Sequence, residues 1–210
     1  MKPFIIGVAG GSGSGKSKVT EQIIHAVGAE KVTVFIQDNF YLDRSHLTPE
    51  ERSRVNFDHP SAFDWTLMTK LLDDLANGVP VEMPQDDFTT HARLAATKTV
   101  TPAKIIILEG IFGLYNEEMC KQMALRIFID TAGDICLMRR LKRDISERNR
   151  TLDSVIEQYS QFLRPMHKKF VEPTKQKAHI IIPNGSNKAA LEMIISRIQS
   201  VLNGDKINFK

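Results

Sequence analysis

The chain has 210 residues, of which 42% are hydrophobic and 25% are charged, and its formal net charge is +3. A chain of this length buries roughly 70% of its unfolded surface, so it needs no disulfide or metal to hold it together. The small net charge argues against general nucleic-acid binding, and two isolated cysteines argue against a disulfide framework. No apolar run approaches the length of a membrane span, so we expect one cytoplasmic domain over residues 1–210.

Five short apolar runs are predicted to be strands. They cover residues 4–9, 32–36, 105–108, 125–129 and 180–182. Helices are expected from Lys16, from Asp64 to about residue 77, and from about Ser186 to Leu202. Strands that are apolar throughout and alternate with amphipathic helices indicate a parallel sheet covered on both faces.

Two segments interrupt this alternation. Residues 79–101 contain prolines and a stretch of alternating polar and apolar residues, which predicts a β-hairpin inserted into the α/β core. Residues 138–150 hold six basic residues but only two acidic ones, Asp144 and Glu147.

A glycine-rich loop separates the first strand from the first helix. It consists of Gly10, Gly11, Ser12, Gly13, Ser14, Gly15, Lys16 and Ser17. Glycines let successive backbone N–H groups point at phosphate oxygens, and the helix N-terminus adds positive potential. Lys16 is expected to reach the β- and γ-phosphates and Ser17 to ligate Mg²⁺. An ordinary glycine turn is disfavoured, because the strand, the lysine and the serine are all present.

Two acidic residues stand where predicted strands end, and ligands of parallel sheets bind beyond those ends. Asp38 could orient a hydroxyl nucleophile and take its proton, although a helix or turn cap is the alternative. Glu109 follows a buried strand and is expected in the Mg²⁺ shell with Ser17 and Asp38; its alternative is a surface carboxylate.

The basic residues of segment 138–150 have two interpretations. Most charge runs form a solvated helix face, which Asp144 and Glu147 could pair internally. A triphosphate site, however, needs cations to offset charge during transfer, and a mobile arginine segment closing over the phosphates supplies them. The phosphate loop favours this second interpretation.

Taken together, these motifs resemble the uridine kinase family (uridine–cytidine kinases) of bacterial type along nearly the whole chain. The matching stretches are GGSGSGKS at 10–17, QDNFY at 37–41, NFDHPSAFD at 56–64, ILEGIF at 107–112, FIDTAGDICLMRRLKRDISER at 128–148, QY at 158–159 and EPTKQKAHIIIP at 172–183. The sequence NFDHP after QDNFY is the most specific of them, since other phosphate-loop kinases lack it.

The resemblance implies a P-loop NTPase-type fold: a five-stranded parallel sheet with helices on both faces, a hairpin over the nucleoside at 79–101, and an arginine-rich lid with its following helix at 134–165. It implies transfer of the γ-phosphoryl group of ATP or GTP, with Mg²⁺, to the 5′-hydroxyl of uridine or cytidine. The products would be UMP or CMP in pyrimidine salvage. It also implies a homotetramer, inhibition by UTP or CTP, and no nucleic-acid or membrane partner.

By the same resemblance, Asp38 would be the base on the 5′-hydroxyl and Asp58 would hold the ribose hydroxyls. Lys16 and three lid arginines would serve the phosphates: Arg140, Arg143 and Arg148. The remaining nucleoside contacts would be Phe57, Phe88, His91, Ile111, Arg150 and Gln158. Of these, His91 on the hairpin would help to read the base edge.

Three positions differ from the family pattern. Asp86, two residues after Pro84, stands where the family usually has a tyrosine that contacts the base, Asn149 replaces a glycine, and Asn184 replaces an arginine near the adenine side. A carboxylate facing the base would accept a hydrogen bond from the cytosine amino group and repel the uracil O4, which would favour cytidine. Asp86 could equally point into solvent. Since asparagine tolerates left-handed backbone, the turn at Asn149 is expected to survive.

Two other classes of protein stay open at this point. Another small-molecule kinase of the same fold, such as phosphoribulokinase or pantothenate kinase, would share the loop and Asp38. It would need neither the sequence NFDHP nor His91. A nucleotide-dependent switch without phosphoryl transfer needs no acceptor base, so the presence of both Asp38 and Asp58 argues against it.

Overall fold

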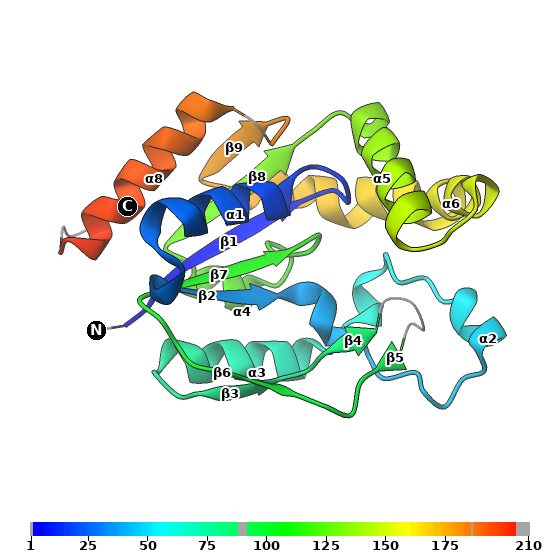
Figure 1. Ribbon diagram of the computed structural model, residues 1–210, viewed down its shortest axis with the longest axis horizontal. Coiled ribbons are helices and arrows are strands. Elements are labelled where there is room, and N and C mark those ends of the chain that lie inside the picture. The colour runs from blue at the N-terminus through cyan, green and yellow to red at the C-terminus, as the bar shows by residue number, and fades with distance from the viewer. Residues whose placement is uncertain (1, 88–91, 186, 205–210) are drawn as a thin grey trace.

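A five-stranded parallel sheet with the order β2-β7-β1-β8-β9 forms the centre of the protein (Figure 1). The computed structural model describes residues 2–87, 92–185 and 187–204. The sheet consists of β1 (Phe4–Gly10), β2 (Val32–Ile36), β7 (Ile105–Gly110), β8 (Leu125–Asp130) and β9 (Ile180–Pro183). All five strands expected from apolar runs are confirmed, and β7 continues through Glu109 to Gly110.

Helices cover both faces of this sheet, as its apolar strands predict (Figure 1). On one face, α1 (Lys16–Val27) and α8 (Lys188–Leu202) pack on a cluster that includes Ile6 and Val8 of β1. On the other face, α3 (Trp65–Ala76) and α4 (Glu117–Gln122) pack on a cluster that includes Ile5. Successive strand side chains point to opposite faces, so β1 contributes to both cores.

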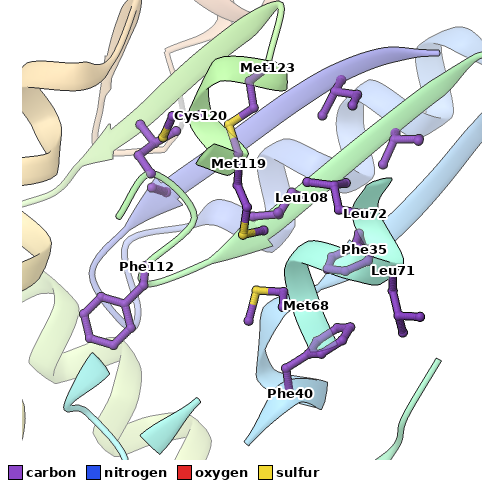
Figure 2. Packing of buried hydrophobic residues seen from close by; sticks show 14 of the residues in the cluster. Phe35, Phe40, Met68, Leu71, Leu72, Leu108, Phe112, Met119, Cys120 and Met123 are labelled. Atoms are coloured by element: carbon purple, nitrogen blue, oxygen red, sulfur yellow. The ribbon is translucent and has the colours of Figure 1, made fainter. Parts of the chain in front are cut away.

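The core beneath α3 is rich in aromatic and sulfur-containing side chains. Figure 2 shows Met68 of α3 beside Phe40, with Phe35 and Leu72 close by. The rings of Phe35 and Phe40 stack with centroids 4.8 Å apart, and neither side chain is exposed to solvent. Phe40 belongs to η2 (Gln37–Phe40), a 3-10 helix directly after β2. This packing therefore anchors the short turn that carries Asp38.

Polar caps set the starts of two helices. The Asp64 side chain accepts a hydrogen bond from the backbone N–H of Leu67, so α3 begins where the sequence predicts. In α8, Asn187 accepts from the N–H of Ala190 and the helix begins at Lys188. The predicted start near Ser186 was therefore too early, and Ser186 itself lies outside the described residues.

The segment 79–101 contains two short antiparallel pairs, as expected of a hairpin. In it β3 (Val81–Met83) pairs with β6 (Lys98–Val100), and β4 (Asp86–Asp87) pairs with β5 (Ala92–Arg93). Val81 and Met83 are buried in the same core as α3, which fixes the base of the hairpin. Residues 88–91, between β4 and β5, lie outside the described residues.

A series of helical segments, the first of them rich in arginine, lies near the carboxyl ends of the strands (Figure 1). They begin with α5 (Gly133–Glu147) and α6 (Leu152–Gln158). Irregular helix follows as η4 (Tyr159–Leu163), α7 (Arg164–Met166), η5 (His167–Val171) and η6 (Glu172–Lys177). Three further short helices occur earlier in the described chain: η1 (Ala29–Lys31), α2 (Pro49–Ser53) and η3 (Pro60–Ala62). In the described ranges, no helix is both long and apolar enough to cross a membrane.

The junction of β2 and β7 depends on a close approach between Gln37 and Gly110. Gln37 is fully buried, and its Oε1 accepts a hydrogen bond of 2.8 Å from the N–H of Phe112. A Cβ atom on Gly110 would lie 2.1 Å from that same oxygen. Only glycine at position 110 therefore leaves room for the amide that joins the two strand ends.

We predict that Gly110→Ala destabilises the protein by about 1–3 kcal/mol, because the added methyl group overpacks a buried site. Urea unfolding followed by circular dichroism measures the change. Gly133→Ala is the matched control: its Cβ would meet only the Tyr159 hydroxyl at 3.6 Å, so the change should stay within about 0.5 kcal/mol. Equal unfolding midpoints for the two variants would contradict the prediction.

Candidate active site

The glycine-rich loop wraps around the N-terminus of α1. Gly13 and Gly15 have positive φ angles of 80° and 105°, a backbone conformation that residues with side chains rarely adopt. Gly15 carries no side chain that could cap α1, so the first N–H groups of the helix stay available to an anion. The loop therefore has the backbone conformation that phosphate binding requires.

Lys16 lies across this loop. Its Nζ donates hydrogen bonds of 3.0 Å to the carbonyl oxygens of both Gly10 and Gly11. Burial lowers the pKa of the ammonium group, while the nearby carboxylates of Glu109 and Asp38 raise it. A cation is thus held at the mouth of the loop, where the β- and γ-phosphates of a nucleotide would lie.

Oxygen ligands for a divalent cation lie beside Lys16. The Ser17 hydroxyl donates a hydrogen bond of 2.6 Å to Oε1 of Glu109, at the carboxyl end of β7. Both residues line a cavity of about 260 Å³ together with Lys16, Asp38 and Arg143. Mg²⁺ is usually held by one or two protein oxygens together with substrate phosphates, and this pair suits that requirement.

A second cavity, of about 210 Å³, adjoins the first. Asp38 lines both cavities. Six of the side chains expected to contact a nucleoside line the second cavity: Phe57, Asp58, Asp86, Ile111, Arg150 and Gln158. The structure therefore brings these predicted residues together, whereas the predictions for Phe88 and His91 fall outside the described residues.

Asp38 lies inside the 3-10 helix η2, whose N-cap position is Ile36, so the structure does not support a role as a cap. Burial raises the pKa of its carboxyl group, and Lys16, Arg148 and Arg143 oppose that shift. A desolvated carboxylate with a raised pKa is a better proton acceptor than an exposed one. Its position between the two cavities allows contact with groups bound in either.

The wall of the second cavity combines aromatic and aliphatic side chains with carboxylates and arginines. Tyr41 packs edge-on against Phe57 with ring centroids 5.3 Å apart, and Ile111 adds aliphatic surface. Asp58 supplies a carboxylate whose pKa is raised by burial and lowered mainly by Arg140. Such a cavity suits a ligand that combines a flat ring with hydroxyl groups.

Four arginines on and after α5 converge on one carboxylate. Asp144 is fully buried, and the arginine nitrogens lie at 3.2 Å (Arg140), 2.9 Å (Arg143), 3.6 Å (Arg148) and 4.0 Å (Arg150) from its oxygens. All four arginines also line the second cavity. The interpretation of this segment as a solvated helix face is therefore wrong for Asp144. Glu147, by contrast, is exposed.

Further hydrogen bonds tie this arginine cluster to its surroundings. Arg140 donates to the Ser12 hydroxyl at 3.1 Å and to Oε1 of Gln158 at 2.9 Å, and Arg150 donates to the same oxygen of Gln158. The turn between α5 and α6 includes Asn149, whose φ of 52° confirms the expected left-handed backbone. Asn184, another departure from the family pattern, also has positive φ, at 60°.

The sequence analysis missed several residues of the site. Tyr41, Leu42 and Arg93 line the second cavity. Tyr41 ends the stretch QDNFY but was assigned no role, and nothing in the local pattern of Leu42 or Arg93 separates them from ordinary loop or strand residues. Asp144 did carry a signal, because it is four residues from both Arg140 and Arg148. That spacing shows which side chains share a helix face, but it cannot show that the face is buried.

A site that can hold a polyphosphate beside a desolvated carboxylate is built for phosphoryl transfer to a hydroxyl group, and the surrounding fold is that of the P-loop kinases. Within this class, the chain belongs to the phosphoribulokinase / uridine kinase family, whose profile matches residues 5–190.

Two bacterial proteins named uridine kinase are similar over nearly the full length. The protein from Deinococcus deserti is 50% identical over 203 residues, covering 96% of this chain and 98% of that protein. The protein from Staphylococcus carnosus is 49% identical with the same coverage of both chains. Phosphoribulokinase from Rhodobacter spheroides shares the fold, with a TM-score of 0.63 at 13% identity over 87% of this chain and 70% of its own.

We predict that Asp144→Asn destabilises the protein by about 3–5 kcal/mol, because it removes a buried carboxylate that lies within ion-pair distance of four clustered arginines. Thermal and urea unfolding measure the loss. Glu147→Gln makes the same chemical change on the exposed end of α5 and should alter stability by no more than about 0.5 kcal/mol. Similar stabilities for both variants would show that Asp144 has no special role.

Proposed function

We propose that the protein is a nucleoside kinase that transfers the γ-phosphoryl group of ATP or GTP to the 5′-hydroxyl of uridine or cytidine. The observation that carries this proposal is the position of Asp38, which lines both the cavity beside the phosphate loop and the cavity beside Asp58. The family to which the chain belongs supports the same reaction.

The donor nucleotide binds in the first cavity. Its phosphate oxygens accept hydrogen bonds from the N–H groups of the loop 10–15 and of the first turn of α1. Lys16 leaves the carbonyl oxygens of Gly10 and Gly11 and turns to the β- and γ-phosphates. Ser17, Glu109 and Asp38 are the residues that would hold Mg²⁺ or its water shell, and the metal ion would supply charge neutralisation between the phosphates.

The acceptor nucleoside binds in the second cavity. Asp58 accepts hydrogen bonds from the ribose hydroxyls, and the base lies against Phe57 and Ile111. The 5′-oxygen then attacks the γ-phosphorus and the bond to the β–γ bridging oxygen breaks. The hydroxyl proton passes to Asp38, so the products are a nucleoside monophosphate and a nucleoside diphosphate.

The arginines offset the negative charge that develops during this transfer. Arg143 lines both cavities, while Arg140 and Arg148 line the second. Burial lowers the pKa of both Arg140 and Arg148, but a guanidinium group keeps its charge at any physiological pH. We assign residues 134–165 as the lid that brings these cations over the phosphates.

Other properties follow from the same proposal. Mg²⁺ dependence, a homotetrameric state and inhibition by UTP or CTP are what the resemblance to uridine kinases implies, and each can be measured on the purified protein. A cytoplasmic location fits Cys120 and Cys136, which are both free and buried.

We predict that Asp38→Asn lowers kcat for uridine or cytidine by about 10²- to 10⁴-fold, since it removes the proton acceptor. The same change should raise thermal stability at neutral pH. Burial raises the pKa of Asp38 in the folded state, so the ionised carboxylate destabilises the fold above that pKa. The stabilisation should shrink as the pH falls through the raised pKa towards the ordinary aspartate value.

Nucleoside-dependent release of ADP measures the activity, and differential scanning calorimetry measures the stability. The exposed Glu192 on α8 provides the control, because Glu192→Gln lies outside both cavities and the lid and should change neither turnover nor the unfolding temperature appreciably. Unchanged turnover in Asp38→Asn would remove the proposed base. A wild-type protein that binds ATP but phosphorylates no nucleoside would instead favour a nucleotide-dependent switch.

A further inference from the structure

Asp86 lies on the wall of the second cavity, so the alternative that it points into solvent is not what the structure shows. It belongs to β4, where it pairs with Arg93 of β5. One of its carboxyl oxygens, Oδ2, is buried and has no hydrogen-bond partner among the described residues. The backbone N–H of Tyr41 donates a hydrogen bond to the carboxyl group of Asp86. A buried polar atom without a partner is uncommon and is explained when a ligand supplies the partner.

Arg93 does not supply that partner. Its guanidinium group donates to the backbone carbonyl of Tyr41, and no ion pair in the described ranges joins it to Asp86. The charge of Arg93 still acts on Asp86 through space and lowers its pKa. The free carboxyl oxygen is therefore left for a group in the cavity.

The residues that line the two cavities indicate which part of a bound nucleoside would lie next to Asp86. Asp38 lines both of them, which is where the 5′-hydroxyl must be for transfer. Asp86, Arg93 and Phe57 line only the second cavity and are absent from the first, which Lys16 and Ser17 line. With the ribose at Asp58, the base is the part of the nucleoside that extends to this end.

We propose that Asp86 reads the substituent at position 4 of the pyrimidine ring, which makes the protein selective for cytidine over uridine. This inference rests on the proposed nucleoside kinase activity. The 4-amino group of cytidine is a hydrogen-bond donor and satisfies the free carboxylate oxygen. Uridine carries a carbonyl oxygen at that position, which meets the carboxylate as a second acceptor and leaves both groups unpaired.

The charge state of Asp86 makes this selectivity depend on pH. Burial, with Asp38 and Asp43, raises the pKa of the Asp86 carboxyl group to about 6, against the lowering effects of Arg93 and the Tyr41 N–H. Across the cavity stand the other charged groups, Asp58, Arg140, Arg143, Arg148 and Arg150. Above pH 6 the carboxylate only accepts hydrogen bonds; below it, the neutral acid also donates, and it can then bond the uridine O4.

The test is a competition experiment in which wild-type protein phosphorylates an equimolar mixture of cytidine and uridine. We expect CMP to form about tenfold or more faster than UMP at about pH 8, and this ratio to fall at about pH 5.5. In Asp86→Asn, whose amide can both donate and accept, the ratio should approach one and lose its pH dependence. The ratio comes from a single mixture, so incomplete folding of a variant and the titration of Asp38 both cancel.

Glu82→Gln is the matched control. Glu82 lies on β3 of the same hairpin, is exposed, and bonds Thr97 and Thr99 rather than the cavity, so this variant should keep the wild-type ratio. Equal rates for cytidine and uridine in the wild type, or an unchanged ratio in Asp86→Asn, would overturn the assignment of Asp86 but leave the kinase activity standing. Turnover of neither nucleoside would overturn the proposed function itself.

Discussion

Mutual repulsion among the arginines is the constraint on which the site depends. Arg140, Arg143, Arg148 and Arg150 line one small cavity, where water screens their charges poorly. The buried carboxylate of Asp144 is in ion-pair distance of all four and lets them share one wall. Asp144 is four positions from both Arg140, in α5, and Arg148, at its C-cap, a spacing that places the three side chains on one helix face. The cluster is thus assembled before any phosphate arrives.

The parallel sheet brings the remaining parts of the site together. β7 lies between β2 and β1 and is parallel to both, so the phosphate loop, η2 and Glu109 all lie at the same edge of the sheet. Gln37 joins two of these strand ends through its bond to Phe112, and Gly110 leaves the room for it. Asp38 is the next residue after Gln37, so the side chain between the two cavities is supported by a buried neighbour. The geometry expected for phosphoryl transfer is in this way a consequence of strand order.

The sequence is sufficient to predict the elements of this arrangement but not all of their contacts. The apolar runs predict all five strands, and the loop 10–17 predicts its own position between β1 and α1, because both signals are local in the chain. The burial of Asp144 could not be predicted in this way, since it depends on how α5 packs. Nor could Tyr41, Leu42 or Arg93 be predicted as cavity residues, because the orientation of the hairpin and the loop after η2 is a tertiary property. The roles of Phe88 and His91 stay predictions.

Lys16 illustrates how a resting site can limit the strength of ligand binding. Its ammonium group already has two carbonyl acceptors, on Gly10 and Gly11, at ordinary hydrogen-bond distances. A phosphate that binds there replaces these bonds rather than adding new ones, so the net gain is the difference between two sets of contacts. The spent nucleotide can leave by the reverse exchange, without a bare cation remaining in a buried position. The loop carbonyl oxygens therefore hold the Lys16 ammonium group whenever no phosphate is bound, and this exchange of partners favours turnover.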